Sequence, residues 1–315
     1  MGDAISLHAV TKTFGSTKAI DDLSLEVPLG GLYGFIGPNG AGKTTTIRIL
    51  MSMLLPDCGR VCVLGQPSAL KAKDRIGYLP EERGTYRKMR VGAFLQYMGR
   101  LKGVHASVIA HRVRIRLERL GLAEYEHKRC EELSKGTQHK VQFLGAVIHD
   151  PDLLILDEPF SGLDPVSTMQ LKALILAEHA RGATILFSTH VMAHAEELCA
   201  HVIMINRGRK VLDDPIAQIR GRYDPRTIRL EPLDAQADDR PLRAVPGVEA
   251  VRRHANGFEI RLAASADPAT AIAHLAAAVR SSRIELARPS LEDIFIGIVS
   301  GSAERSGSAS AATER

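Results

Sequence analysis

Four short apolar segments in the first 190 residues have the patterns of β-strands. SLHAVTKTF and SLEVPLG alternate between apolar and polar positions, as half-buried strands do. DLLILD and ATILFS are continuously apolar and bounded by polar residues, which is typical of buried strands in a parallel sheet.

Two stretches have the spacing of helices instead. In TTTIRILMSML, Ile47, Leu50 and Leu54 fall on one helical face. The stretch 107–121 contains an alternating VRIRL, but its apolar residues recur at helical intervals, so a helix is favoured. We expect Ser107 to cap this helix and Gly121 to end it. The alternation of strands and helices predicts an α/β domain.

The pattern changes near residue 222. The next segment mixes charge, Pro and Asp, as a linker containing one strand would. VEAVRRHANGFEIRLA predicts a hairpin that turns at Asn256-Gly257. Asp267 and Pro268 are expected at the N-cap and first position of an alanine-rich helix. RIELARPSLEDIFIGIV then adds a strand and a closing helix.

Three regions follow from these patterns. Residues 1–222 are predicted to form the α/β domain, and residues 223–299 a small α+β domain. Residues 300–315, which are rich in Ser, Gly and Ala, are predicted to be disordered.

Composition narrows the classes of partner. The chain of 315 residues has a net charge of +5, which permits an anionic partner without requiring one. We expect no nucleic acid, because aromatic residues make up 4% of the chain and Trp is absent. No apolar run approaches the roughly 18 residues of a membrane span, so we expect a soluble protein. The four scattered cysteines indicate reduced thiols, and Cys58 and Cys62 alone do not predict a metal site.

A complete G-x4-G-K-[ST] motif lies between a predicted strand and a predicted helix, which is the context that a P-loop requires. Glycines let backbone N–H groups face phosphate oxygens, and the helix N-terminus adds partial positive charge. Lys43 is expected to reach the β- and γ-phosphates, and the Thr44 hydroxyl to ligate Mg²⁺. The predicted nucleotide-binding residues here are Gly37, Pro38, Asn39, Gly40, Ala41, Gly42, Lys43, Thr44 and Thr45.

Two acids follow the apolar strand 153–156. Asp157, at the tip of a buried strand beside the P-loop, is expected to hold Mg²⁺, directly or through water. Glu158 is placed to activate an attacking water as general base. Alone, such a pair also fits a helix N-terminus with charge in its first turn, and the preceding P-loop is what favours catalysis.

Together, residues 4–220 resemble the nucleotide-binding subunit of an ATP-binding-cassette (ABC) transporter. This resemblance implies an ABC ATPase fold of the P-loop NTPase class, with a mixed sheet core and a helical subdomain. It also implies a homodimer, or a pair with a second ATPase subunit, that holds two ATP molecules between its subunits. LSKGTQ, about twenty residues before Asp157, matches the signature loop, normally LSGGQ. By this resemblance, Ser134 and Gly136 contact the γ-phosphate bound by the partner.

The same resemblance assigns four further residues. His190 in LFSTHV matches the switch histidine that contacts the γ-phosphate, although a lone histidine at a strand end is often structural. Asp164 matches the loop that couples the two sites across the dimer. Phe14 matches the aromatic residue that stacks on adenine, with core packing as the open alternative. Glu81 stands where the family has a glutamine, and could accept a hydrogen bond from a metal-bound water.

The motifs PEERG and LSKG, with Lys135 and Thr137 in the signature, resemble a branch that energises exporters of sodium, drugs or similar compounds. ARPSLEDIF resembles the small accessory domain of that branch. The resemblance implies a separate multi-span permease, contacted through residues 78–130, and a cytoplasmic position at the inner face of the cell membrane. The alternatives are a non-transport ABC ATPase acting on a ribosome or nucleic-acid complex, and a P-loop kinase or GTPase. A GTPase is disfavoured because a guanine-specific N-K-x-D motif is absent, and either reading would leave LSKGTQ and the histidine at 190 unexplained.

Overall fold

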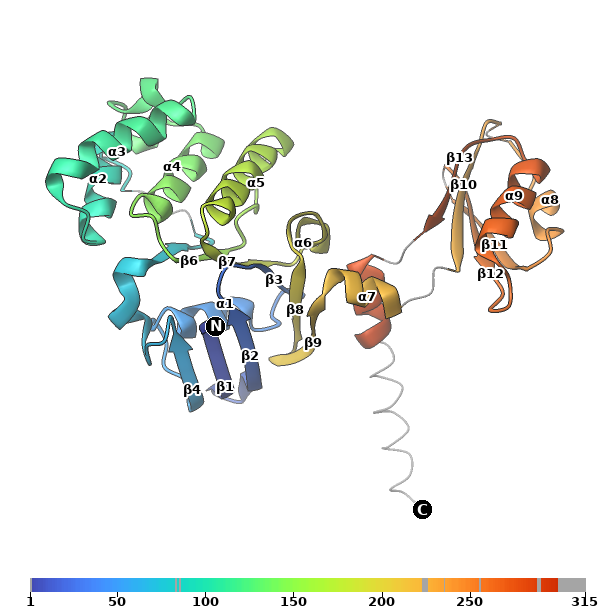
Figure 1. Cartoon of the computed structure of the whole chain (residues 1–315), viewed down its shortest axis with the longest axis horizontal. Helices are drawn as coiled ribbons and strands as arrows, with labels where there is room; N and C mark the ends of the chain where they lie inside the picture. Colours follow the sequence, from blue (N-terminus) through green and yellow to red (C-terminus); the bar gives the residue numbers. More distant parts are fainter. Residues whose placement is uncertain are drawn as a thin grey trace, which may run out of the picture. The chain divides into compact units, whose positions relative to one another are not determined.

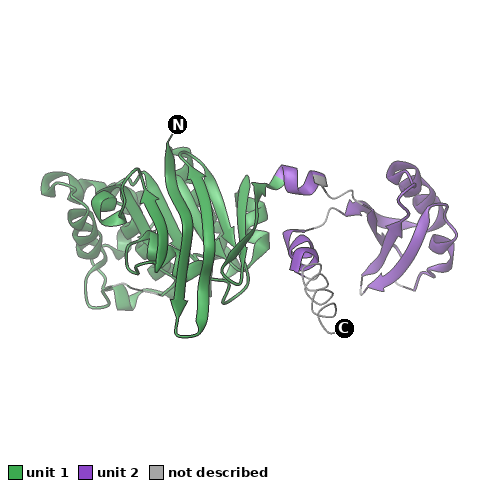
Figure 2. Cartoon of the chain, turned by 90° about the horizontal axis from the view of Figure 1, so that it is seen from below, with its two compact units in different colours: residues 1–216 green, residues 217–315 purple. Residues whose placement is uncertain are grey.

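The computed structural model describes residues 2–299 except 83, 85, 223–225, 235, 255 and 288–289. The chain divides into two compact units, Met1–Ile216 and Ala217–Arg315, called unit 1 and unit 2 (Figure 2). The predicted tail, 300–315, lies outside the described residues, as do three residues directly after the predicted boundary at 222. No helix among the described residues is long and apolar enough to cross a membrane.

Unit 1 contains a three-stranded antiparallel sheet in the order β2-β1-β4. Its strands are β1 (Asp3–Phe14), β2 (Thr17–Pro28) and β4 (Cys58–Val63). Because side chains alternate between the two faces of a strand, Leu23, Leu25 and Val27 of β2 all point into the core. The predicted strands SLHAVTKTF and SLEVPLG are therefore confirmed.

The second sheet of unit 1 has six strands in the order β5-β6-β7-β3-β8-β9. All neighbouring pairs are parallel except β8 and β9. The strands are β3 (Leu32–Ile36), β5 (Ile76–Leu79), β6 (Leu153–Asp157), β7 (Thr184–Thr189), β8 (His201–Asn206) and β9 (Arg209–Pro215). The prediction of buried parallel strands at DLLILD and ATILFS is confirmed, since every residue of β6 and β7 is buried.

Helices surround these sheets. Helices α2, α3 and α4 gather at one end of unit 1, away from the three-stranded sheet (Figure 1). This agrees with the expected mixed-sheet core and helical subdomain. The α-helices of unit 1 are α1 (Lys43–Leu50), α2 (Val91–Leu101), α3 (Ala106–Arg119), α4 (Lys135–Val147), α5 (Pro165–Ala180) and α6 (Met192–Leu198), and the 3-10 helices are η1 (Ala69–Arg75), η2 (Ala123–Tyr125) and η3 (Cys130–Glu132).

Two predictions about helix ends were wrong. The helix expected to reach Leu54 ends at Leu50, because Ser52 adopts a left-handed conformation (φ 56°) and Met53 N–H bonds back to Arg48 O. Helix α3 is capped by His105 and not by Ser107: the His105 ring accepts a hydrogen bond from the Ser107 N–H at 3.4 Å.

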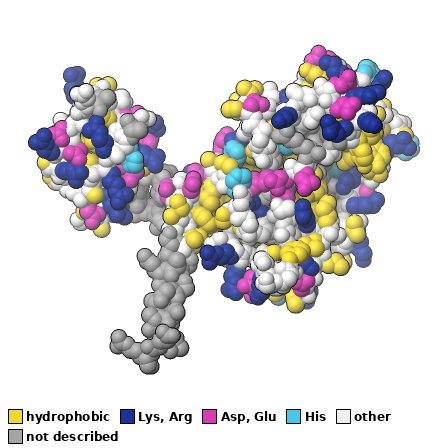
Figure 3. All heavy atoms as spheres, turned by 180° about the vertical axis from the view of Figure 1, so that it is seen from behind, with side chains coloured by type: hydrophobic (Ala, Val, Ile, Leu, Met, Phe, Trp, Pro, Cys, Tyr) yellow, Lys and Arg dark blue, Asp and Glu magenta, His cyan; other side chains and the backbone are white. Residues whose placement is uncertain are grey.

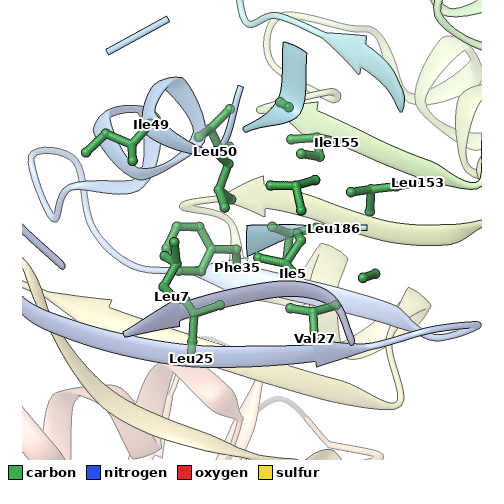
Figure 4. Packing of buried hydrophobic residues seen from close by; sticks show 14 of the residues in the cluster. Ile5, Leu7, Leu25, Val27, Phe35, Ile49, Leu50, Leu153, Ile155 and Leu186 are labelled. Carbon is green, nitrogen blue, oxygen red and sulfur yellow. The ribbon is translucent and has the colours of Figure 1, made fainter. Parts of the chain in front are cut away.

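The main core of unit 1 lies between its two sheets, with α1 and Phe35 inside it. Figure 4 shows the Phe35 ring between Leu7 and Leu25 of the three-stranded sheet and Leu50 of α1, with Leu186 of β7 nearby. Burial of such side chains is the main favourable term in folding. The core therefore fixes α1, which carries the P-loop, against both sheets.

Unit 2 contains a four-stranded antiparallel sheet in the order β11-β12-β10-β13. The β-α-β-β-α-β sequence with this strand order is a split βαβ, or ferredoxin-like, arrangement. The hairpin itself and the helix beginning with Asp267 and Pro268 are confirmed. The predicted turn of the hairpin at Asn256-Gly257 is displaced by one residue, because Gly257 is already the first residue of β12 and pairs with His254. On the face of unit 2 that Figure 3 shows, side chains of both signs of charge are interspersed. Its elements are α7 (Ile216–Arg222, from its second residue), β10 (Thr227–Pro232), α8 (Arg240–Arg243), β11 (Val248–His254), β12 (Gly257–Leu262), α9 (Pro268–Ala278), β13 (Ser281–Ala287) and helical residues 291–299.

His149, between α4 and β6, is expected to make unit 1 less stable in acid. Burial, and secondarily the Lys102 ammonium, lower the pKa of His149 from its usual value of about 6.5 to about 4, although its ring contacts Ile76 O at 3.1 Å. The unfolded chain therefore binds a proton at His149 more readily than the folded chain does. The contribution of the neutral His149 to the free energy of unfolding is complete above pH 6.5 and is lost as the pH falls toward 4. Between pH 7 and pH 5 the loss is about 2 kcal/mol.

Urea unfolding followed by circular dichroism at pH 7 and pH 5 checks this expectation. His149→Gln, which keeps an amide donor for Ile76 O, should lose about 2 kcal/mol less than the wild type over this interval. His254→Gln, at an exposed histidine of unit 2, is the control and should behave like the wild type. Equal losses in all three proteins would contradict the assignment to His149.

Candidate nucleotide site

The candidate site lies where three strands of the six-stranded sheet end. The P-loop follows β3, Asp157 ends β6, and His190 follows β7. The carboxyl ends of neighbouring parallel strands meet at one edge of a sheet, where α/β proteins bind ligands. The strand carrying Asp157 is not the neighbour of the P-loop strand: β7 lies between them. Asp157 was expected at the tip of a strand beside the P-loop. Because β7 separates the two strands, β7 also contributes side chains to the site.

The P-loop, residues 37–44, is held close to neighbouring backbone. A Cβ on Gly37 would lie 2.3 Å from Ile205 O, and one on Gly42 would lie 2.6 Å from Ala19 O. Gly42 also has φ 106°, a conformation that other residues rarely adopt. These two glycines are therefore required by the packing of the loop as well as by its shape.

Lys43 begins α1, and its side chain is buried against the P-loop. Its ammonium donates to Gly37 O at 2.8 Å and to Pro38 O at 3.2 Å. The same nitrogen lies 3.4 Å from Glu158 Oε1. Lys43 thus joins the P-loop to the acid that follows β6.

Asp157 is buried and accepts hydrogen bonds from hydroxyl groups on two elements. Ser188 of β7 donates to its Oδ1 at 2.6 Å, and Thr44 of α1 donates to the same oxygen at 3.4 Å. Burial raises the pKa of Asp157, the two hydrogen bonds act to lower it, and the charges of Glu81 and Glu158 raise it further. An acid in such surroundings is stabilised in its charged form by a nearby cation.

Glu158 adopts a left-handed backbone conformation, with φ 46°. For a residue with a Cβ this costs about 1 kcal/mol or more. Its N–H donates to Ser188 Oγ at 3.0 Å, and its carboxylate lies 3.0 Å from His190 Nδ1 as well as near Lys43. The side chain of His190 is 42% exposed. Glu158 is therefore buried between a cation and a histidine that solvent reaches.

Glu81 lies in the loop after β5 and shares a cavity with Thr44 and Asp157. The cavity has a volume of about 410 Å³ and is also lined by Tyr78 and Gln142. Oxygen atoms of carboxylates and hydroxyls are the donors that Mg²⁺ prefers, so this set fits the ion. The sequence-predicted residues for a metal are thus brought to one cavity.

Phe14, at the end of β1, is 50% exposed. The alternative that Phe14 packs in the core is therefore wrong. Lys12 Nζ lies 5.7 Å from the centre of its ring. An exposed aromatic face of this kind is available to stack on a planar base.

The signature loop forms the start of α4. Ser134 is the N-cap, and its Oγ accepts the Thr137 N–H at 3.2 Å. This segment is therefore the N-terminus of a helix, and Ser134 and Lys135 are exposed there. Gly136 is packed closely, since a Cβ there would lie 2.4 Å from Ser167 Oγ.

Asp164 caps α5 in the same region. Its carboxylate accepts from the Ser167 N–H at 2.9 Å and from the Ser167 hydroxyl at 2.6 Å. These hydrogen bonds hold the pKa of Asp164 below its usual range. Ser167 therefore lies against both Asp164 at the start of α5 and Gly136 at the start of α4.

The structure thus brings the predicted residues into two groups. One surrounds the P-loop and contains Lys43, Thr44, Asp157, Glu158, His190 and Glu81. The other contains Ser134, Gly136 and Asp164. Sequence reasoning missed Ser188 and Ser167. Ser188 could have been suspected from the sequence, because it lies two residues before His190 at the end of a predicted strand. In the structure this position is opposite Asp157 on the paired strand.

Comparisons with known proteins add to this geometry. Residues 20–161 match the family model described as ABC transporter, and residues 215–299 match that of the ATP-binding protein DrrA1-3-like, C-terminal domain. The chain is 40% identical to the uncharacterized ABC transporter ATP-binding protein YhaQ of Bacillus subtilis (strain 168), over 93% of this chain and 97% of the relative.

Two further similarities concern export and fold. The chain is 37% identical to the Nod factor export ATP-binding protein I of Cupriavidus pinatubonensis, over 66% of this chain and 65% of the relative. It also superposes on the solved structure of an ATP binding subunit of an ABC transporter with a TM-score of 0.64. That alignment has 26% identity and covers 70% of this chain and 92% of the other.

Proposed function

Because the chain belongs to the ATP-binding subunits of ABC transporters, we propose that it hydrolyses ATP to drive export through a separate permease. The observation that carries the proposal is the gathering of Lys43, Asp157, Glu158 and His190 around the P-loop. Export is supported by the Nod factor export relative. The alternative of an ABC ATPase acting on a ribosome or nucleic-acid complex is not favoured, since these relatives are named as transporter subunits.

In this proposal Glu158 accepts a proton from the water that attacks the γ-phosphate. Lys43, which is 3.4 Å from Glu158, lies where it would also neutralise phosphate charge. His190 would contact the γ-phosphate from the other side of Glu158. Mg²⁺, held by Thr44 and Asp157 with Glu81 nearby, would supply further neutralisation of phosphate charge. Phe14 would stack on the adenine ring.

We propose that two chains pair head-to-tail, so that the second group of residues serves the partner's ATP. Ser134 and Gly136 would present a hydroxyl and a backbone N–H to the γ-phosphate. Asp164 would couple the two sites, through the Ser167 contact that already joins its loop to Gly136. Lys135 would not interfere, because its side chain is exposed beside these groups.

The permease would bind at the cavity that contains Glu81, between α1 and α2, and hold the subunit at the inner face of the cell membrane. Met53, which lines this cavity, is 60% exposed. Large exposed apolar side chains around a cavity are typical of protein contacts. The same cavity reaches Thr44 and Asp157, so movement of a partner there would be felt at the nucleotide.

Met53→Glu tests this contact. We expect the variant to keep its ATPase activity in solution and to lose most of its recovery of a multi-span membrane protein in pull-downs from detergent-solubilised membranes. Leu29→Glu, at an apolar residue that is 50% exposed in the turn after β2, is the matched control and should recover it normally. Recovery of ribosomes, with no multi-span protein, would contradict the transport function.

A further inference from the structure

Ser188 connects the two acids of the proposed active site. It lies on β7 directly opposite Asp157 of β6, and it is fully buried. Its hydroxyl donates to Asp157 Oδ1 at 2.6 Å, and its Oγ accepts the N–H of Glu158 at 3.0 Å. One hydroxyl therefore fixes a side chain of one acid and the backbone of the other.

Among the described residues, no other hydrogen bond holds the Asp157 carboxylate or the Glu158 N–H as closely as those to Ser188. The hydrogen bond from Thr44 to Asp157 is 3.4 Å long, beyond the usual range for O–H···O bonds. A residue with a Cβ keeps a left-handed backbone conformation only where neighbouring groups hold it there. For Glu158 the hydrogen bond from its N–H to Ser188 is such a contact. That conformation aims the Glu158 carboxylate at Lys43 and His190.

We propose that Ser188 is a positioning residue, which holds Asp157 for the metal and Glu158 for the attacking water. This inference rests on the proposed function. The hydrogen bonds that join Asp157 and Glu158 both end on Ser188 of β7, so the strand that leads to His190 also sets the geometry of both acids. A change at the end of β7 would move all three groups together.

Ser188→Ala tests the inference, and Thr184→Val is its control. Thr184 lies on the same strand, is also buried, and accepts a backbone hydrogen bond from Gly30 at 2.9 Å, but it lies at the opposite end of β7. Both variants lose one buried hydroxyl, so a purely structural effect would appear in both. If Ser188→Ala does not fold, Ser188→Cys keeps the shape, weakens both hydrogen bonds and carries the same test.

For Ser188→Ala we expect kcat at saturating Mg²⁺ to fall by about 10- to 100-fold, because the reacting groups are misplaced. KM for ATP should change by less than about threefold, because the P-loop is intact. In binding titrations with a fluorescent, slowly hydrolysed ATP analogue, affinity in EDTA should be unchanged. The Mg²⁺ concentration that half-saturates the tightening of binding should rise by about 10-fold, as for other groups that orient metal ligands.

The inference is overturned if Ser188→Ala matches Thr184→Val in both kcat and the Mg²⁺ titration. It is also overturned if Ser188→Ala loses affinity equally with and without Mg²⁺. Glu158→Gln, assayed in parallel, separates this failure from failure of the proposed function. A slow Glu158→Gln with a normal Ser188→Ala rejects only the role of Ser188, whereas a Glu158→Gln that hydrolyses ATP at the native rate rejects the base assignment itself.

Discussion

Replacing Glu158 by glutamine is expected to lower kcat for ATP hydrolysis by about 100-fold or more while ATP still binds. The amide keeps the size of the side chain but does not accept the proton of the attacking water. Lys43 and the P-loop are untouched, so phosphate binding should persist. The variant should therefore accumulate as an ATP-bound dimer, seen as a shift in size-exclusion chromatography with ATP and Mg²⁺.

The control for this prediction is Glu197→Gln. Glu197 lies on α6, its side chain is 62% exposed, and it pairs with Lys172 outside the proposed site. Its removal should leave kcat unchanged and should produce no ATP-dependent shift in size. Hydrolysis by Glu158→Gln at the native rate would mean that another group accepts the proton.

Mixing two inactive variants is expected to restore hydrolysis. Lys43→Ala removes the cation of the P-loop, and Ser134→Asp places a negative charge where the partner's γ-phosphate would lie. Aspartate is a good N-cap, so α4 should still form and the defect should be electrostatic. Each variant alone should lose about 100-fold or more of its activity.

In a mixed dimer, the intact P-loop of the Ser134→Asp chain meets the intact signature loop of the Lys43→Ala chain. Roughly a quarter of wild-type activity should return in an equimolar mixture, because half of randomly paired dimers are mixed and each has one intact site. Phosphate release is measured before and after mixing. No recovery would mean that Ser134 acts on the nucleotide of its own chain, or that the two chains do not exchange.

The candidate site was largely predictable because its motifs are local. A P-loop lies between a strand and a helix, and in this chain an apolar run, GLYGFIG, leads into the motif and a helical spacing follows Lys43. Asp157 and Glu158 could be identified because a buried strand ends directly before them. The βαββαβ arrangement of unit 2 was less accessible, although its hairpin and its Asp267-Pro268 helix start were recognised.

Apolar spacing alone was insufficient at two positions. Helix α1 ends at Leu50 because Ser52 is left-handed, although Leu54 continues the apolar spacing. Phe14 is an apolar residue in a strand, and the alternation of the strand did not tell whether its ring is covered. Its 50% exposure depends on what the rest of the fold leaves uncovered beside the end of β1.

The sequence by itself therefore determined which groups could perform the chemistry: a P-loop lysine, two acids after a strand, and a histidine after the next strand. Tertiary structure alone decided how these groups meet. The place of β7 beside β3 depends on hydrogen bonds between segments more than a hundred residues apart, and no periodicity along the chain encodes it. By inserting β7 between β3 and β6, the fold places Ser188 against both Asp157 and Glu158. That contact joins the acids to the strand of His190.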